Sequence, residues 1–320
     1  MRIDYKQAAE FIKNCDNVLI LAHSSPDGDT VGSSFALCRA LRNLGKRVNV
    51  SCADEIPEKY DYITDWCAPQ IFDVETVIAC DVAGVHLLGE NNAVRYGERV
   101  DLCIDHHISN TDYARRLLLG EHSASACEVI YTLLVTADIP VDRMTAQCIY
   151  TGMATDTGCF RFENVTSETH RIASVLYTYD IPFGAINRHL FDIKSKARLK
   201  TEQIVMSQPE FCCGGKCAII AITADIIEKE GLDDGELEGI PALPMQIEGV
   251  EIGITIKEKE RGVYKVSVRT ASVDASAICA NFGGGGHIRA AGCKFSGTYL
   301  EDVKQKMAAA AAEALEYDGQ

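Results

Sequence analysis

Histidines and aspartates follow apolar runs at several places in the N-terminal half of the chain. The first run, residues 18–22, leads into the sequence HSSPDGDTVGS, which places one imidazole and two carboxylates within seven residues. Runs 77–80 and 100–104 are also followed directly by such residues, and a further aspartate lies in the sequence GMATDTGCF. The residues in question are His23, Asp27, Asp29, Asp81, Asp105, His106, His107 and Asp156. Imidazole nitrogens and carboxylate oxygens bind divalent metal ions, so these residues are candidate metal ligands.

Short apolar runs separated by helical patterns predict a parallel sheet that is covered by helices on both faces. The carboxyl ends of the strands in such a sheet share one edge, where ligands bind. Carboxylates crowded at that edge would repel one another and raise one another's pKa. Two divalent cations would remove the repulsion. Mixed histidine and aspartate ligands favour manganese, with Mg²⁺, Co²⁺, Fe²⁺ and Zn²⁺ as alternatives.

A structural role is the ordinary explanation for any one of these residues taken alone. An aspartate after a strand often caps a helix, and an isolated histidine usually lies in the core or on the surface. Four groups that converge on one edge favour a shared site instead. The structural role is retained for the histidines outside the motifs, which are His86, His122, His170 and His189.

The chain is long enough for two domains, with 320 residues of which 47% are hydrophobic. We expect an α/β fold with an N-terminal parallel-sheet domain over 1–190, a helical linker over 191–208 and a smaller mixed-sheet α/β domain over 209–320. The substrate is expected in a cleft between the two domains. In the second domain, strand patterns cover 217–223, 250–259 and 263–270, and helical patterns cover 276–282 and 300–315.

The net charge of −15 excludes a protein that coats long nucleic acid, because such binding needs a continuous basic face. A short anionic substrate needs only a local cationic pocket. The sequence has no secretory signal and no run of roughly 20 apolar residues, so we expect a soluble, cytoplasmic protein. Its 14 cysteines are scattered and are expected to be reduced thiols. Cys212, Cys213 and Cys217 are weak evidence for a soft-metal site and fit a turn between strands better.

In their order and spacing, the N-terminal motifs resemble those of the DHH phosphoesterase superfamily, which takes its name from the motif found here as Asp105-His106-His107. HSSPDGDTVGS, ACD and ATDTGCFRF match other motifs of that family. Near the C-terminus, FGGGGHIRAAG at 282–292, preceded by VSVRT, resembles the glycine-rich signature of the DHH-associated nucleotide-binding domain. The resemblance covers nearly the whole chain, and five ordered motifs make it specific.

The resemblance implies two metal ions that share one carboxylate. It assigns His23, Asp27 and Asp81 to one ion, and Asp29, Asp81, His106 and Asp156 to the other. Asp81 would therefore bridge the two ions. Such a pair can activate a water molecule, orient the phosphorus and stabilise the leaving oxygen.

The resemblance also implies residues that act on the substrate. Asp105 would orient a histidine, and His107 would face the phosphate and stabilise the charge that develops in the transition state. Arg269 would bind a terminal phosphate through its planar guanidinium group. The substrate-binding set is completed by Arg161, Gly284, Gly285, Gly286 and His287, whose glycines let backbone N–H groups approach a phosphate or base.

Within the superfamily, the compact two-domain form resembles nano-RNase/pAp phosphatases. These enzymes degrade short oligonucleotides, linear dinucleotides and 3′-phosphoadenosine 5′-phosphate (pAp). The resemblance implies that a metal-activated water attacks phosphorus. From the charge and the apolar runs, neither long nucleic acid nor a membrane is expected as a partner. The chain could form a homodimer. The alternatives are a cyclic-dinucleotide phosphodiesterase, an inorganic pyrophosphatase and a non-catalytic nucleotide-binding protein. Leu87 stands where many relatives carry an arginine, which leaves the substrate preference open.

Overall fold

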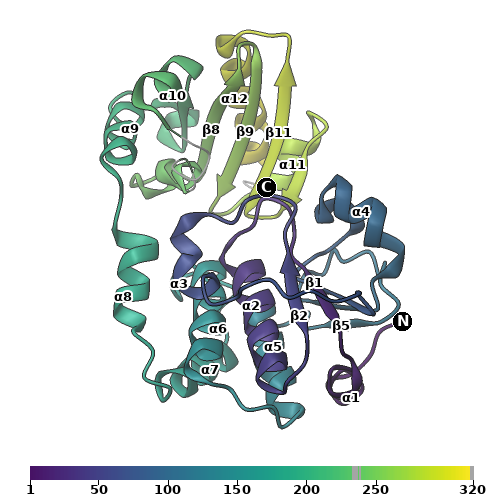
Figure 1. Ribbon diagram of the computed structural model, residues 1–320. Coiled ribbons are helices and arrows are strands. Elements are labelled where there is room, and N and C mark those ends of the chain that lie inside the picture. The colour runs from purple at the N-terminus through teal and green to yellow at the C-terminus, as the bar shows by residue number, and fades with distance from the viewer. Residues whose placement is uncertain (233–236, 238, 318–320) are drawn as a thin grey trace. The chain divides into compact units, whose positions relative to one another are not determined.

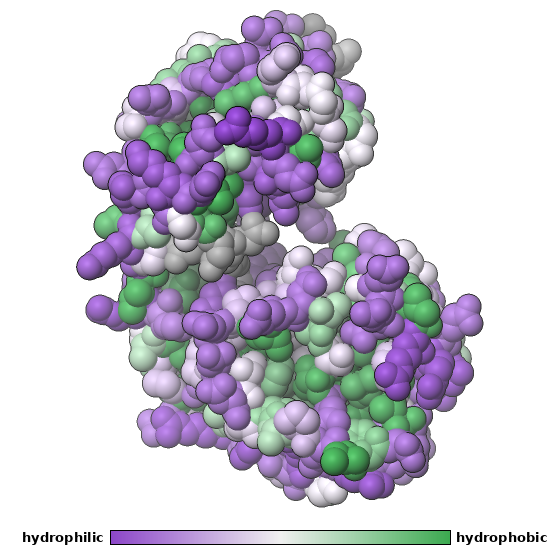
Figure 2. All heavy atoms as spheres, turned by 45° about the horizontal axis from the view of Figure 1, so that its top comes forward, coloured by the Kyte–Doolittle hydropathy of each residue, from purple (hydrophilic) through white to green (hydrophobic). Residues whose placement is uncertain are grey.

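The computed structural model describes residues 1–232, 237 and 239–317. The chain divides into two compact units, Met1–Ile193 and Lys194–Gln320 (Figure 1). Each unit contains a β-sheet covered by helices, which confirms the predicted α/β class. Among the described residues, no helix is long and apolar enough to cross a lipid bilayer. Figure 2 shows hydrophilic residues over much of one face of the molecule, with smaller groups of hydrophobic residues between them.

The first unit is built on a five-stranded sheet of the order β2-β1-β3-β4-β5, in which all neighbouring strands are parallel. The strands are β1 Val18–Leu21, β2 Val48–Ser51, β3 Thr76–Cys80, β4 Leu102–Asp105 and β5 Leu117–Leu119. The chain passes from β1 to β2 on one side and later returns to β3 on the other side. The strand order therefore reverses between β1 and β3. Ligands of open parallel sheets bind at such a point, beyond the carboxyl ends of the strands.

Helices pack on both faces of this sheet, which explains why its strands are unbroken apolar runs. Val18 and Ile20 of β1 belong to the core formed with α2, α5 and α6, whereas Leu19 and Leu21 belong to the core that includes α4. The helices of this unit are α1 Tyr5–Asn14, α2 Gly28–Asn43, α3 Asp61–Thr64, α4 Glu90–Tyr96, α5 Ala126–Thr136, α6 Arg143–Asp156, α7 Ser167–Tyr177 and α8 Phe183–Asn187.

The second unit contains a mixed six-stranded sheet of the order β10-β11-β9-β8-β7-β6. Only β7 and β8 pair in parallel within this described sheet. The strands are β6 Glu210–Cys212, β7 Cys217–Ile222, β8 Ile252–Glu260, β9 Val263–Thr270, β10 Gly285–His287 and β11 Ala290–Ser296. The helices are α9 Lys196–Met206, α10 Ala224–Glu230, α11 Ala275–Ala280 and α12 Leu300–Tyr317. Helices α11 and α12 pack on one face, and α9 and α10 pack near β7 on the other.

The glycine-rich segment near the C-terminus forms part of this sheet. Gly285 pairs with Gly292 and Gly286 pairs with Ala291, so the segment begins a β-hairpin at the edge of the sheet. Gly286 has a φ of 149°, and a Cβ there would lie 2.6 Å from the Ala291 Cα. Of Gly285, Gly286 and Gly292, only Gly285 has open space for a side chain. Part of the glycine content is therefore required by the hairpin itself.

Candidate metal centre

The eight candidate residues of the first unit lie at the carboxyl edge of its sheet and at adjoining helix ends. His23 lies two residues beyond β1, Asp81 directly follows β3, and Asp105 is the last residue of β4. Asp27 and Asp29 lie at the start of α2, and Asp156 is the last residue of α6. The two histidines after Asp105 complete the set. The predicted strand ends and helix ends are thus brought together around the point where the strand order reverses.

Asp81 lies between two groups of potential ligands. Its Oδ2 is 3.6 Å from His23 Nε2, whereas its Oδ1 is 3.6 Å from His106 Nε2. The side chain is only 2% exposed, and Oδ1 has no hydrogen bond among the described residues. A buried carboxylate oxygen without a hydrogen bond is costly unless a cation binds it. The residue itself has a φ of 60°, a left-handed conformation that is strained for an aspartate.

The potential ligand atoms form three overlapping groups, and the atoms within each group lie within 4.8 Å of one another, a separation that one bound cation can span. His23, Asp27 and Asp81 form the first cluster, in which His23 Nε2 lies 3.6 Å from Asp27 Oδ1. Asp29, His106 and Asp156 form the second cluster, in which His106 Nε2 lies 3.8 Å from Asp29 Oδ2 and 3.4 Å from Asp156 Oδ2. Asp81 also groups with His106 and His107, and its Oδ1 is 3.4 Å from His107 Nδ1. The six predicted metal ligands therefore converge, and Asp81 adjoins both clusters through His23 and His106. These nitrogen and oxygen donors fit divalent cations.

Glycines allow α2 and α6 to approach closely enough to bring the carboxylates together. A Cβ at Gly32 would lie 2.5 Å from the Cys148 carbonyl oxygen, and a Cβ at Gly152 would lie 2.7 Å from Asp29 Oδ1. Any larger residue at these two positions would push the helices apart. Gly28 is likewise packed against Thr155, and it belongs to the first turn of α2 rather than to a free turn between Asp27 and Asp29.

Backbone N–H groups hold both aspartates of α2 in place. Asp27 is the N-cap of α2, and its Oδ1 accepts hydrogen bonds from the N–H groups of Asp29 and Thr30 at 3.0 and 3.1 Å. Asp29 is fully buried, and its carboxylate accepts from the N–H groups of Ala126 at 2.6 Å and Cys127 at 3.0 Å. Those donors lie at the N-terminus of α5, where unpaired N–H groups favour an anion. The sequence shows no sign of this long-range contact.

Burial and neighbouring charges raise the pKa of several groups in the centre. Burial raises the pKa of Asp29 well above its usual value, and the charges of Asp81 and Asp156 raise it further. Burial also raises the pKa of Asp156 to about 8, with contributions from Asp81 and Asp27. Burial alone would lower the pKa of His23, but hydrogen bonds to Asp27 and Asp81 raise it to about 11. Divalent cations would replace these protons, because metal ligands bind in their deprotonated forms.

Asp105 is not part of either cluster, and it orients the neighbouring histidine. Its Oδ1 accepts a hydrogen bond from His107 Nδ1 at 2.9 Å, and its Oδ2 accepts from Asn110 Nδ2 at 2.6 Å. Asp105 is fully buried. Burial alone would lower the pKa of His107, but the hydrogen bond to Asp105 and the charge of Asp81 raise it to about 9. Asn110 was not predicted as a functional residue, although it lies only five positions beyond Asp105.

The predicted substrate-binding residues fall in both units. Arg269 of β9 pairs with Ala290 of β11, and Ala290 pairs with His287 of β10, so Arg269 and His287 flank Ala290 on one face of the second sheet. Gly284 directly precedes β10. It is closely packed, since a Cβ there would lie 2.6 Å from the Cys293 Cβ. Arg161 belongs to the first unit, is exposed, and donates from Nε to the Gly158 carbonyl at 2.6 Å.

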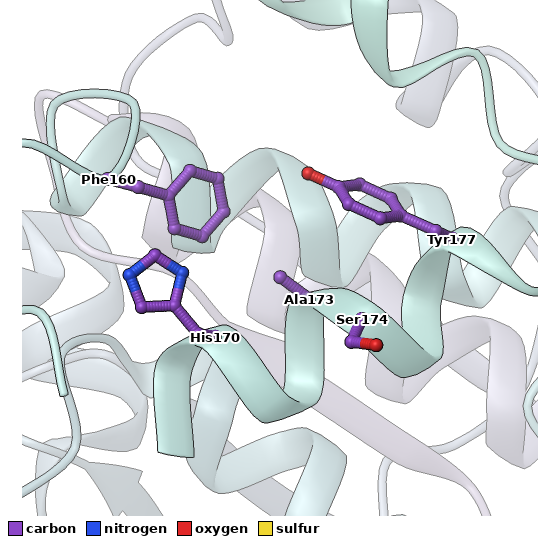
Figure 3. Close-up of a pocket in the computed structure, with 5 residues that line it drawn as sticks. All are labelled: Phe160, His170, Ala173, Ser174 and Tyr177. Atoms are coloured by element: carbon purple, nitrogen blue, oxygen red, sulfur yellow. The ribbon is translucent and has the colours of Figure 1, made fainter. Parts of the chain in front are cut away.

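A surface pocket of about 280 Å³ lies in the first unit beside the segment that follows α6. Figure 3 shows Phe160 beside the ring of His170 on one side of the pocket, Tyr177 on the other, and Ala173 between them. The Phe160 and His170 rings stack with centroids 5.9 Å apart. None of the candidate metal ligands lines this pocket. The contact gives His170 a packing role, consistent with its structural interpretation.

Both units match known families. The model of the DHH family, N-terminal domain, matches residues 17–153, and the model of the DHHA1 domain matches residues 214–316. The bifunctional oligoribonuclease and PAP phosphatase NrnA of Thermus thermophilus is 29% identical over 322 residues, which cover 96% of this chain and 93% of that protein. The protein of the same name from Bacillus subtilis is 25% identical over 284 residues, with coverages of 87% and 88%. The crystal structure of an exopolyphosphatase-related protein from Bacteroides fragilis is similar, with a TM-score of 0.87 and 26% identity, over 98% of this chain and 96% of that one.

Proposed function

The chain belongs to the DHH family of phosphoesterases and carries a C-terminal DHHA1 domain, and from this premise we propose that it hydrolyses short oligoribonucleotides, linear dinucleotides and pAp. The observation that carries the proposal is the position of Asp81, whose two oxygens face two separate groups of ligands. A carboxylate shared in this way is the feature expected of a two-metal hydrolase. The relatives that align over most of the chain are named as oligoribonucleases and PAP phosphatases.

In this proposal two divalent ions, manganese in the first place, occupy the centre. His23, Asp27 and Asp81 hold one ion, and Asp29, Asp81, His106 and Asp156 hold the other. When bound, the ions supply an activated water and stabilise the charge on the phosphoryl oxygens. Mixed imidazole and carboxylate donors support manganese over magnesium, which prefers oxygen ligands and retains several waters.

The remaining residues of the first unit act on the substrate. His107 faces the reacting phosphate, and its imidazole is oriented by the hydrogen bond from Nδ1 to Asp105. That bond fixes the orientation of the ring, so that the opposite nitrogen, Nε2, is directed away from the carboxylate. A protonated His107 would stabilise negative charge on a phosphoryl oxygen, and the raised pKa of about 9 keeps it protonated near neutral pH.

The second unit binds the end of the substrate remote from the reacting phosphate. Arg269 and His287 lie on one face of its sheet, and Gly285 leaves the backbone there open to a ligand. Together with Gly284 and Gly286 they form the proposed binding surface of this unit, and Arg161 is the proposed substrate-binding residue of the first unit. Binding energy from the remote end can align the reacting phosphate, so this surface should contribute to turnover as well as to affinity.

A substrate panel tests the proposal. The purified, manganese-loaded protein is assayed with pAp, a linear dinucleotide, cyclic di-AMP and pyrophosphate, and the products are separated by chromatography. The proposal predicts that the dinucleotide and pAp are the preferred substrates and that both yield mononucleotides. Preference for cyclic di-AMP or pyrophosphate would assign the chain to the corresponding alternative activity. Absence of hydrolysis of all four compounds by metal-loaded protein would favour the non-catalytic nucleotide-binding alternative.

A further inference from the structure

The segment that leads into α5, residues 123–126, contacts two members of the second ligand cluster through its backbone. The Ser123 carbonyl accepts a hydrogen bond from His106 Nδ1 at 3.2 Å, and the Ala126 N–H donates to Asp29 Oδ2 at 2.6 Å. Because a carbonyl oxygen can only accept, His106 carries a proton on Nδ1, and its Nε2 faces the cluster. This segment therefore holds both ligands in their orientation.

Asp156, the third member of that cluster, comes from a different part of the chain and is joined to this segment by Asn164. It is the last residue of α6, where backbone carbonyls lack a partner within the helix. Asn164 Nδ2 donates to the Asp156 carbonyl at 3.1 Å and to the Ala124 carbonyl at 3.0 Å. Ala124 is buried, and a buried carbonyl is costly to leave without a donor. One side-chain amide thus ties the end of α6 to residues 123–126.

The turn that brings Asn164 back to the end of α6 has a strained backbone. Gly158, Cys159 and Phe160 have φ values of 55°, 61° and 61°. This left-handed conformation is rare for residues with a side chain, and above all for a bulky one such as phenylalanine. Strain of this kind persists only where the surrounding structure holds it, and it gathers at functional sites. The strained turn lies between Asp156 and Asn164, so it is part of the path that lets the two residues meet.

We propose that Asn164 is a positioning residue for the second metal ion, because it sets the place of Asp156 relative to Asp29 and His106. The inference rests on the two-ion centre of the proposed function and deepens it: one ion depends on Asn164 and the other does not. The ligands assigned to the first ion alone, His23 and Asp27, follow β1 and begin α2, away from both hydrogen bonds of Asn164. Loss of a partner that supports a metal ligand typically lowers metal affinity by roughly 10- to 100-fold.

Manganese binding tests the inference without a substrate. Asn164→Ala removes the amide, and Asn164→Leu removes it while keeping most of its volume, which separates the hydrogen bonds from packing. Asn49→Ala is the matched control, because Asn49 Nδ2 also donates to the backbone carbonyl of a distant residue, Gln70, at 2.8 Å, but from β2, outside both clusters. The metal-free, full-length proteins are titrated with manganese, and the free ion is measured by electron paramagnetic resonance.

Both Asn164 variants should bind one manganese ion with the wild-type affinity and the second roughly 10- to 100-fold more weakly, whereas Asn49→Ala should bind both as the wild type does. Unchanged affinity for both ions in Asn164→Ala, or equal weakening of both, would overturn the inference. Wild-type affinities in Asn164→Leu would assign the effect to packing and would overturn it as well.

A double-mutant cycle shows through which ligand Asn164 acts. Asp156→Ala weakens the second ion directly, so the addition of Asn164→Ala should weaken it little further. In Asp27→Ala, where the first ion is weakened, Asn164→Ala should still weaken the second ion by its full factor. Additive losses in the Asp156→Ala protein would show that Asn164 does not act through Asp156 and would refute its positioning role.

Hydrolysis of pAp and of a dinucleotide is measured separately, so that failure of the proposed function and failure of this inference can be told apart. A wild type that binds two manganese ions but hydrolyses neither compound would reject the proposed function alone, since the manganese affinities still decide the role of Asn164. A wild type that binds fewer than two ions would reject both.

Discussion

Asn110 tests how the centre is held together, because its side chain bonds a buried carboxylate that is outside the proposed metal ligands. Its Nδ2 donates to Asp105 Oδ2 at 2.6 Å and to the Val82 carbonyl at 3.3 Å, and its Oδ1 accepts from the Asp112 N–H at 2.9 Å. A hydrogen bond to a charged group contributes about 1.5–3 kcal/mol, and a neutral one about 0.5–1.5 kcal/mol. Asn110→Ala, which removes one bond to a charged group and two neutral bonds, should therefore lower the free energy of unfolding by about 2.5–6 kcal/mol.

The same substitution should impair turnover, because Asp105 would lose the bond that fixes its second oxygen and with it the orientation of His107. Removal of such supporting partners typically lowers activity by roughly 10- to 100-fold. Bound manganese should not change. Asn43→Ala is a matched control: Asn43 Nδ2 also donates to a carboxylate oxygen, Asp142 Oδ2, at 3.0 Å, but on the exposed surface. Its effect on stability should stay within about 0.5 kcal/mol.

Urea unfolding at a fixed manganese concentration gives the free energy of unfolding of each variant, and initial rates with pAp give kcat. If Asn110→Ala kept the stability and the kcat of the Asn43→Ala control, the hydrogen bond to Asp105 would have no role. If the variant lost stability but kept its kcat, Asn110 would support the fold without orienting His107.

Three further predictions follow from the geometry. His107→Ala should lose most of its turnover while retaining bound manganese, and loss of the metal would show that His107 is a ligand. Arg269→Ala should impair cleavage of dinucleotides and pAp far more than hydrolysis of a small chromogenic phosphodiester, and equal losses would remove the remote-binding role. The metal-free protein should become less stable as the pH rises from about 5 to 8, because Asp156, with a pKa of about 8 in the folded state, keeps a proton that the unfolded chain releases. Manganese replaces that proton, so its effect on Tm should be larger at about pH 8 than at about pH 6, and equal effects would contradict the proton exchange.

The sequence predicts the elements and the residue types of the centre because both depend on local patterns. Apolar runs covered on two faces indicate β1, β3 and β4, and polar residues at their ends indicate a site. Long-range contacts leave no such pattern. The bonds from Ala126 and Cys127 to Asp29 join residues nearly one hundred positions apart, and their geometry follows from helix packing at Gly152. The bond between Asn110 and Asp105 depends on the conformation of the turn after β4.

Strand register in the second unit was equally inaccessible from sequence. Lys265 and Lys294 lie in separate segments, and only the pairing of β9 with β11 places them opposite one another. Backbone pairing of Gly285 and Gly286 makes the glycine-rich segment an edge strand, which a run of glycines does not indicate.

The most direct test of the central claim is to measure manganese content and hydrolysis together in the wild type and in Asp81→Ala. Asp81 is the one residue assigned to both ions, and its oxygens face both ligand clusters. The metal-free wild type should regain two equivalents of manganese and convert pAp to AMP and phosphate, whereas Asp81→Ala should bind fewer than two equivalents and show no turnover. Two full equivalents in Asp81→Ala, or hydrolysis of pAp by the metal-free wild type, would contradict a two-metal centre bridged by this carboxylate.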